Sequence, residues 1–374
     1  MENLYIIIAA FITAVILGRI IIPNILVISM RKRLFDEPDA RKIHKRPIPR
    51  LGGVTFFPVI VFTLCTFSAI HLFNGHFTYN VITLNMVQEM LFLVSGLTLL
   101  YIVGIADDLI GVRYRKKFIV QIISATMFPI SGLYINSFYG LFGIHEITPM
   151  LGIPFTMLLV VFITNAINLI DGIDGLASGL SIVALVVFGV IFVHFQAWIY
   201  ALLAFISVGV IIPFFSYNVF GNADRGRKIF MGDTGSLTLG YILSFFVISL
   251  CMGELNALTQ IQGSPVMIAF SVLMVPCLDV VRVVLRRARN RKPLFLPDKT
   301  HIHHKFLAMG FSPRRALIMI QIMSACFCAF TIGSLNFMNN TVIFIIDIAT
   351  WILLNIWFDK IIAKKEINHL TQKE

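Results

Sequence analysis

The chain has 374 residues, of which 58% are hydrophobic and 13% are charged, and its mean hydropathy is +0.88. Because an ordinary soluble domain carries about 25% charged residues, this composition excludes a soluble globular protein, a disordered chain, a coiled coil, a collagen-like repeat and a disulfide scaffold. The formal net charge of +11 would indicate nucleic acid as the partner of a soluble protein. In a membrane protein, the positions of the Lys and Arg residues along the chain decide whether this interpretation holds.

A helix needs about 20 mostly apolar residues to cross a membrane. This rule predicts an all-α polytopic membrane protein with about eleven spans, near residues 4–29, 53–73, 86–105, 118–135, 154–170, 176–194, 197–216, 236–252, 266–284, 315–333 and 341–359. These spans leave no long soluble segment, so we predict one integral membrane domain over residues 1–374. The first span is preceded by no basic residue and followed by the cluster Arg31-Lys32-Arg33. That polarity is typical of a retained anchor with its N-terminus outside, and not of a cleaved signal peptide.

Lysine and arginine are confined to alternate connections between the predicted spans. All but one of the 30 lie after spans one, three, seven or nine or in the C-terminal tail, and the exception, Arg19, lies inside span one. The opposite loops, around residues 74–85, 136–153, 253–264 and 334–340, contain none. Because cytoplasmic loops carry the excess of Lys and Arg, we expect the N-terminus outside and the C-terminus in the cytoplasm. The positive charge therefore marks the inner membrane face, and we expect no nucleic-acid partner.

Acidic residues, which are costly near a membrane and usually functional, gather at the inner ends of the predicted spans. Asp107 and Asp108 follow the third span. Adjacent carboxylates repel each other and suit a divalent cation, a general base or both; a solvated cap of the next helix is the alternative. Lys117, at the mouth of the fourth span, fits either a phosphate contact or an anchor at the membrane interface.

A second polar group, Asn165 to Gly175, lies at the inner end of the fifth span. In a helix, Asn168, Asp171 and Asp174 repeat every three residues and share one face. The glycines within this group indicate that the helix ends here and that the backbone turns close to a ligand. Two amides and two acids so near an apolar span have little structural explanation, and we interpret them as a binding site.

A third group, Phe230 to Ser236, precedes the eighth span and places Asp233 between two glycines. Backbone N–H groups at a helix N-terminus bind phosphate, so this segment predicts a phosphate and metal site. A simple N-cap is the alternative for Asp233. Phe230 fits stacking on a base, although a single Phe near a membrane commonly packs against other apolar groups.

The last group is a histidine motif, in which His301, His303 and His304 lie within four residues. Three histidines fit zinc, but this loop contains many Lys and Arg residues and no nearby Cys. We therefore favour an anion site, such as one for pyrophosphate, with a solvated loop as the remaining alternative. Acids suited to Mg²⁺ and cations suited to phosphates at one membrane face predict phosphoryl transfer onto or from a lipid.

These motifs resemble those of the polyprenyl-phosphate N-acetylhexosamine-1-phosphate transferases, and most closely their bacterial branch, the undecaprenyl-phosphate GlcNAc-1-phosphate transferases. The resemblance covers nearly the whole chain and rests on five segments in the family's order: Arg50-Leu51-Gly52-Gly53, Asp107-Asp108, Asn165 to Gly175, Phe230 to Ser236, and His301 to His304. It implies an enzyme of the bacterial cytoplasmic membrane whose active site faces the cytoplasm. That enzyme would transfer HexNAc-1-phosphate, with GlcNAc as the expected sugar, from a UDP-sugar to undecaprenyl phosphate and release UMP.

The lipid product, undecaprenyl-diphosphate-HexNAc, would initiate a cell-surface glycopolymer such as O-antigen lipopolysaccharide or teichoic acid. The histidine motif differs from that of the related peptidoglycan enzyme by the intervening Ile302, so we do not expect a phospho-MurNAc-pentapeptide donor. The implied partners are UDP-HexNAc, undecaprenyl phosphate and the lipid bilayer. The motifs leave open which HexNAc is used and whether the protein forms a homodimer.

The resemblance also implies residue roles. Mg²⁺, with Mn²⁺ as the alternative, would be held by Asn168 and Asp233. The uridine would be bound by Phe230, Asp171 and Asp174, and the sugar and pyrophosphate by His301, His303 and His304. Catalysis would fall to Lys117 on the phosphates and to Asp107 and Asp108, which would deprotonate or orient the lipid phosphate. Apart from Asn168, near the end of the fifth span, these residues belong to the predicted cytoplasmic loops near 30–52, 106–117, 171–176, 217–236 and 285–315.

We expect direct displacement by the lipid phosphate, held in line with the departing UMP. A covalent aspartyl-phosphate on Asp107 or Asp108 is the alternative. Two other classes share some of the features. An intramembrane prenyltransferase would use Asp-rich motifs, but the residues after Asp108 lack the spacing of a second such motif. An ion-coupled transporter would place its acids near the membrane midplane, whereas these acids lie at the inner ends of the spans.

Overall fold

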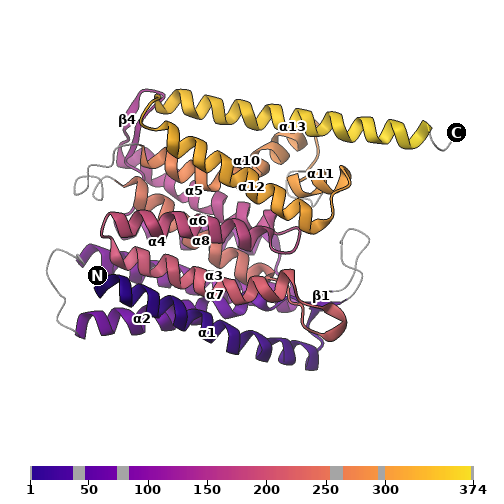
Figure 1. Cartoon of the computed structure of the whole chain (residues 1–374). Helices are drawn as coiled ribbons and strands as arrows, with labels where there is room; N and C mark the ends of the chain where they lie inside the picture. Colours follow the sequence, from indigo (N-terminus) through magenta and orange to yellow (C-terminus); the bar gives the residue numbers. More distant parts are fainter. Residues whose placement is uncertain (1, 37–46, 74–83, 253–263, 294–299, 372–374) are drawn as a thin grey trace.

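The computed structural model describes residues 2–36, 47–73, 84–252, 264–293 and 300–371, so parts of the predicted loops 30–52 and 285–315 lie outside the described residues. The helices are α1 (Glu2–Arg31), α2 (Phe56–Phe73), α3 (Leu84–Ile110), α4 (Tyr114–Ile130), α5 (Pro149–Ile170), α6 (Leu176–His194), α7 (Trp198–Val219), α8 (Gly232–Cys251), α10 (Pro265–Arg289), α11 (Ile302–Ala308), α12 (Pro313–Ser334) and α13 (Asn340–Thr371). Apart from the short α11, they run side by side as one bundle, with the two chain termini at opposite ends (Figure 1).

The predicted all-α, membrane-spanning character is confirmed, because ten of the described helices are long and apolar enough to cross a membrane. The remaining predicted span, near residues 118–135, corresponds to α4, which begins earlier, at Tyr114, and has 17 residues. At 1.5 Å per residue α4 is roughly 26 Å long, close to the ~30 Å thickness of a bilayer's hydrocarbon core. It packs along α3 and α5, and we therefore treat it as a crossing helix as well.

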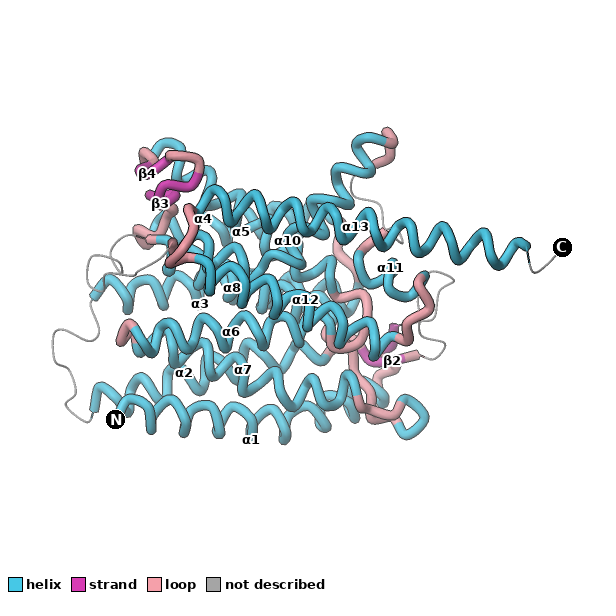
Figure 2. Tube along the Cα trace, turned by 45° about the horizontal axis from the view of Figure 1, so that its top comes forward, coloured by secondary structure: helices cyan, strands magenta, loops and turns pink. Residues whose placement is uncertain are grey.

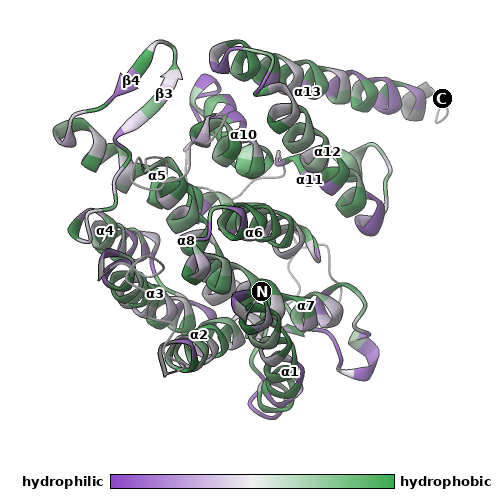
Figure 3. Ribbon diagram, turned by 60° about the vertical axis from the view of Figure 1, so that its left-hand side comes forward, coloured by the Kyte–Doolittle hydropathy of each residue, from purple (hydrophilic) through white to green (hydrophobic). Residues whose placement is uncertain are grey.

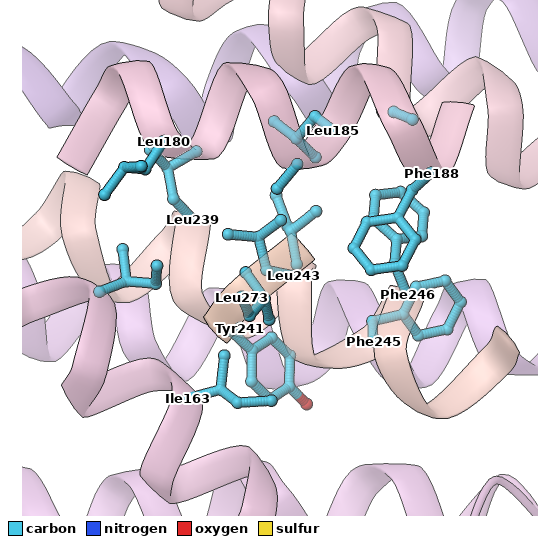
Figure 4. Close-up of a cluster of buried hydrophobic side chains, with 14 of the residues drawn as sticks. Ile163, Leu180, Leu185, Phe188, Leu239, Tyr241, Leu243, Phe245, Phe246 and Leu273 are labelled. Atoms are coloured by element: carbon cyan, nitrogen blue, oxygen red, sulfur yellow. The ribbon is translucent and has the colours of Figure 1, made fainter. Parts of the chain in front are cut away.

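Helix α8 lies at the centre of the bundle. It packs against α3, α5, α6 and α10, and Figure 3 shows it between α3, α5 and α6. The apolar window of α8 is buried along its whole length. Its side chains Tyr241, Phe245 and Phe246 pack with Phe188 of α6 and Leu273 of α10 in the buried cluster of Figure 4. The residues at the first turn of α8 therefore belong to the most deeply buried of the described membrane-spanning helices.

Two pairs of short strands mark the two ends of the bundle (Figure 2). At one end β3 (Ser137–Leu141) and β4 (Ile144–Glu146) form an antiparallel hairpin that the sequence did not predict. At the other end β1 (Phe35–Asp36) pairs with β2 (Ile48–Pro49). The C-terminal ends of α3, α5 and α7 and the N-terminal ends of α4, α6 and α8 meet at this second end. The acidic groups predicted as functional therefore gather at one end of the bundle.

Helix α13 is longer than the predicted span at 341–359. It continues to Thr371, and its 32 residues make it roughly 48 Å long, so its last part extends beyond the other helices (Figure 1). Before that last part, Lys305 of α11 donates to Asp359 Oδ1 (2.8 Å) and to Asn355 Oδ1 (3.1 Å) of α13. Because α11 carries the histidine motif, these contacts of α13 support that motif.

Candidate functional site at one end of the bundle

The Arg-Leu-Gly-Gly motif lies beside the segment that leads into α8. Phe230 N donates to Pro49 O (2.7 Å), and Gly53 N donates to Met231 O (2.8 Å). A Cβ at Gly53 would lie 2.2 Å from the N and Cα atoms of Gly235, so the backbone approach requires glycine. The first motif therefore holds the start of α8, far away in the sequence, in place.

We expect Gly53→Ala to lower the thermal unfolding midpoint, because the atoms that an added methyl group would meet belong to backbone and cannot rotate away. Overpacking a filled interior costs about 1–3 kcal/mol. Gly333→Ala is the matched control, since a Cβ at that position meets nothing within 4 Å. Thermal unfolding of the purified protein in detergent measures the difference, and equal midpoints for the two variants would contradict the close contact.

Four helices bring polar side chains together at the first turn of α8. Asp233 accepts hydrogen bonds from Lys117 Nζ of α4 and, at 3.1 Å, from Asn168 Nδ2 of α5. Lys117 Nζ also donates to Asp107 Oδ2 of α3 at 3.0 Å. Asn168 Nδ2 donates in addition to Ser236 Oγ (2.8 Å). The structure thus brings four of the predicted residues into one partly buried cluster of two acids, one amide and one cation.

Asp108 lies next to this cluster but makes different contacts. Its Oδ1 accepts a hydrogen bond from Asp233 N (2.8 Å), and its Oδ2 accepts from Thr234 N (3.0 Å) and Thr234 Oγ1 (2.6 Å). The first N–H groups of a helix lack partners within that helix, and a carboxylate there is also favoured by the helix dipole. Asp108 of α3 therefore caps α8 and fixes the position of Asp233. Its own part in the chemistry stays a prediction.

Asp233 and Asn168 fit the oxygen ligands that Mg²⁺ or Mn²⁺ prefers. In the described part of the chain, no three His, Cys, Asp or Glu side chains are placed to enclose a metal ion. Mg²⁺ is commonly bound by one or two carboxylates together with waters and substrate phosphates. One carboxylate and one amide at the end of the bundle therefore suit an ion that the protein and a phosphate substrate hold jointly.

The predicted end of the helix is confirmed, because α5 ends at Ile170, two residues before Gly172. Beyond that end, Asp174 Oδ2 lies 2.5 Å from Lys228 Nζ. Gly175 adopts a φ of +80°, and its N–H donates to Asn218 Oδ1 (2.6 Å). The buried Asn218 side chain also donates to Ile229 O (2.8 Å). One amide side chain thus joins the turn to the segment before α8.

Asp171 is the C-cap residue of α5 and faces mostly negative neighbours. Burial, followed by the negative charges of Asp174, Asp233 and Asp108, raises the pKa of Asp171 to about 7, and Arg50 opposes this shift. The structure therefore places this predicted uridine-binding residue between the turn and the cluster at α8.

Asp171→Asn should raise the thermal unfolding midpoint more at pH 8 than at pH 5. The folded protein keeps a proton on Asp171 that the unfolded chain, with a carboxyl pKa of 3.8, releases. The contribution of Asp171 to the free energy of unfolding must then fall as the pH rises from about 4 to about 7 and stay constant above pH 7. Asparagine has no titrating carboxyl, so the variant does not lose this stability as the pH rises. Midpoints in EDTA without nucleotide measure the effect, and an equal gain at both pH values would contradict the raised pKa.

The histidine motif contacts the same α5–α6 turn. A Cβ at Gly172 would lie 2.1 Å from His303 Nε2, so the imidazole ring packs directly on this glycine. Burial, followed by the charges of His304 and His301, lowers the pKa of His303 to about 3, and this ring is therefore neutral near pH 7. The rings of His301 and His303 stack with centroids 5.9 Å apart. The predicted pyrophosphate motif therefore packs against the turn that carries the predicted uridine-binding residues Asp171 and Asp174.

Asp279 of α10 is a candidate residue that the sequence analysis missed. This fully buried carboxylate lies 2.8 Å from His301 Nδ1, and it accepts hydrogen bonds from Ile302 N (3.0 Å) and from the Arg282 guanidinium (2.7 Å). A carboxylate on one ring nitrogen orients the imidazole and leaves Nε2 for a ligand. The available signal was an acid inside an apolar span, which is rare without a function.

Comparisons with known proteins identify the family of the chain. The model of glycosyl transferase family 4 matches residues 90–251. The chain is 32% identical over 327 residues to a probable undecaprenyl-phosphate N-acetylglucosaminyl 1-phosphate transferase of Bacillus subtilis (strain 168), covering 87% of this chain and 84% of that protein. It is 28% identical to the undecaprenyl-phosphate alpha-N-acetylglucosaminyl 1-phosphate transferase of Yersinia pestis and 30% identical to that of Salmonella typhi, in each case covering 80% of this chain and 76% of the relative. The resemblance inferred from the five motifs is confirmed, and the chain belongs to glycosyl transferase family 4.

Proposed function

We propose that the protein transfers HexNAc-1-phosphate, with GlcNAc as the expected sugar, from a UDP-sugar to undecaprenyl phosphate and releases UMP. The observation that carries this proposal is the convergence of Asp107, Lys117, Asn168 and Asp233 from four membrane helices. Acids and a cation at the end of an apolar bundle suit a reaction between a water-soluble pyrophosphate and a lipid phosphate. The names of the relatives support undecaprenyl phosphate as the acceptor and GlcNAc as the sugar.

The proposed side of the membrane is the cytoplasm of a bacterium. The site lies at the bundle end that carries the described Lys and Arg residues of the predicted inner loops, and such residues accumulate on the cytoplasmic side. The product, undecaprenyl-diphosphate-HexNAc, would there be the first lipid-linked sugar of a cell-surface glycopolymer.

In the proposed complex the nucleotide lies over the α5–α6 turn and the segment before α8. Phe230 stacks on the uracil, and Asp174 and Asp171 bind the uridine from the turn. His301, His303 and His304 bind the sugar and pyrophosphate from the other side of Gly172, whose backbone touches the His303 ring. Mg²⁺, held by Asn168 and Asp233 together with the pyrophosphate, would supply positive charge where negative charge develops.

The proposed reaction is a single displacement at phosphorus. An oxygen of the lipid phosphate attacks the β-phosphorus, the bond to UMP breaks, and UMP leaves with the bonding electrons. Lys117 neutralises the phosphate oxygens. Asp107 is held by Val112 N (2.6 Å) and by Lys117 (3.0 Å), and from there it orients the lipid phosphate or removes its remaining proton.

The proposal is tested with purified protein, UDP-GlcNAc, undecaprenyl phosphate and Mg²⁺. We expect UMP release that requires the lipid and stops in EDTA, and a panel of UDP-HexNAc donors identifies the sugar. UMP release that does not depend on the lipid, or transport of the lipid or nucleotide without UMP release, would contradict the proposal.

We further expect inversion of configuration when the transferred phosphorus of the donor is made chiral, because a single in-line displacement inverts that centre. Net retention would indicate two displacements through an aspartyl-phosphate and would contradict direct attack by the lipid. Phosphorus stereochemical analysis of the lipid product distinguishes the two courses.

A further inference from the structure

Two amide side chains that the proposed reaction does not use face each other between α4 and α5. Asn165 Nδ2 donates to Gln121 Oε1 (2.6 Å), and Gln121 Nε2 donates to Asn165 Oδ1 (3.4 Å). Asn165 Nδ2 also donates to Val161 O (2.7 Å). Because a backbone carbonyl only accepts hydrogen bonds, this last contact fixes which side of the Asn165 amide carries the NH₂ group. The pair therefore has one defined orientation, in which the oxygen of each amide accepts from the NH₂ group of the other.

The pair lies inside the bundle, where polar groups without hydrogen bonds are costly. Gln121 is only 3% exposed, and both amides use their oxygen and their nitrogen in the bonds between them. Sliding α4 along α5, or rotating it, would separate the amides and leave these groups without partners. Apolar side chains impose no such condition, since one apolar contact can replace another, and polar pairs link helices in membranes for this reason. The pair therefore fixes the register of α4 against α5.

This register matters for the cluster at the first turn of α8. Lys117 precedes Gln121 by four residues on α4, and Asn168 follows Asn165 by three residues on α5. Residues three or four apart share one face of a helix, so both lie one turn from the pair, toward the end of the bundle that carries the site. Lys117 and Asn168 donate to different oxygens of the same carboxylate, Asp233 Oδ2 and Oδ1. The register of α4 against α5 thus decides whether both side chains reach Asp233.

We propose that Gln121 and Asn165 are positioning residues, whose paired amides hold Lys117 and Asn168 in the relative placement that joint binding of the metal ion and the phosphates requires. This inference rests on the proposed function. In this role the two amides touch neither substrate nor metal and act only through the residues one turn away. An amide pair suits the task because it carries no net charge, so it leaves the charge balance of the cluster unchanged.

The experiment compares four variants of the full-length protein: Gln121→Leu, Asn165→Leu, both leucines together, and the exchanged amides, Gln121→Asn with Asn165→Gln. Each is measured for its thermal unfolding midpoint, its rate of UMP release and its affinity for Mn²⁺. The EPR signal of free Mn²⁺, with UDP-GlcNAc present and the lipid absent, gives the affinity without turnover. Loss of a group that orients a metal ligand lowers metal affinity or activity about 10- to 100-fold. We expect losses in this range, in both quantities, for each single leucine variant.

The double leucine variant separates positioning from stability. Replacing both partners of a hydrogen bond by apolar groups of similar size is nearly neutral, so its midpoint should return toward that of the wild type. Its Mn²⁺ affinity and its rate should stay low, because nothing restores the register of α4 against α5. The exchanged amides can still pair, and this variant should exceed the double leucine variant in both Mn²⁺ affinity and rate.

Thr156→Val is the matched control, since this buried threonine accepts a hydrogen bond from Ile135 N (2.9 Å) near the other end of α5. It should lower the midpoint and keep the wild-type Mn²⁺ affinity and rate. If the double leucine variant regains its rate and Mn²⁺ affinity together with its midpoint, the pair only stabilises the fold, and the inference is wrong. Single leucine variants with wild-type values overturn it as well. If the single variants do not fold, equal rates for the double leucine variant and the exchanged amides overturn it. A wild type that releases no UMP, or binds no Mn²⁺, contradicts the proposed function instead.

Discussion

Asp233→Asn should reduce the rate of UMP release at least about a hundredfold, the range seen when one preorganised electrostatic group is removed from an active site. The carboxylate accepts from Lys117 and Asn168, and it is the charged ligand proposed for Mg²⁺. Asparagine keeps the shape of the side chain and removes its charge. Initial rates at saturating UDP-GlcNAc and undecaprenyl phosphate measure the effect.

Asp224→Asn is the matched control, because Asp224 is an exposed acid in the same connection between α7 and α8. This variant should keep the wild-type rate. Thermal unfolding midpoints of the two variants show whether either substitution disturbs the fold. Near-normal turnover of Asp233→Asn would remove Asp233 from the reacting centre.

Asp108→Ala should nearly abolish UMP release and lower the thermal unfolding midpoint. Alanine removes the acceptor for two N–H groups and one hydroxyl at the start of α8. Loss of a helix N-cap costs about 0.5–2 kcal/mol, and each buried donor left unpaired costs about 1–3 kcal/mol. The first turn of α8, with Asp233 on it, would then lose its fixed position.

Asp108→Asn separates this positioning role from a role in proton transfer. An asparagine side chain still offers one oxygen to the N–H groups, so we expect it to restore part of both the midpoint and the rate. Residual activity well above that of Asp108→Ala supports a cap. Asparagine and alanine variants that are equally inactive, both with wild-type midpoints, would mean that the charge of Asp108 acts on the substrate directly.

The spans, the grouping of the motifs at one end and most of the clustered residues could be predicted from the sequence. Hydropathy over about 20 residues is a strong local signal, and acids at the ends of apolar segments are rarely incidental. The boundaries of α4 were less predictable, because its first turn contains Arg115, Lys116 and Lys117 and the polar start hides the beginning of the helix.

Contacts between distant segments could not be predicted in the same way. Asp108 caps a helix that begins more than a hundred residues later, and the usual cap signal lies directly before its own helix. Asn218 links Gly175 to Ile229, and neither its neighbours nor its spacing distinguish it from an ordinary amide at a helix end. Asp279 was predictable in principle, since its apolar surroundings in α10 are visible in the sequence.

The contacts between α13 and α11 place two proposed functions in separate parts of the structure. The first is sugar binding by the histidine motif, and the second is phosphoryl transfer at the start of α8. The contacts of Lys305 with Asn355 and Asp359 lie outside the helices that carry Asp107, Lys117, Asn168 and Asp233. Substitutions at Asn355 and Asp359 should therefore shift the histidine motif by small amounts without displacing the residues proposed to carry out phosphoryl transfer. Sequence changes in α13 would thus alter the proposed sugar site while the residues proposed for phosphoryl transfer stay in place.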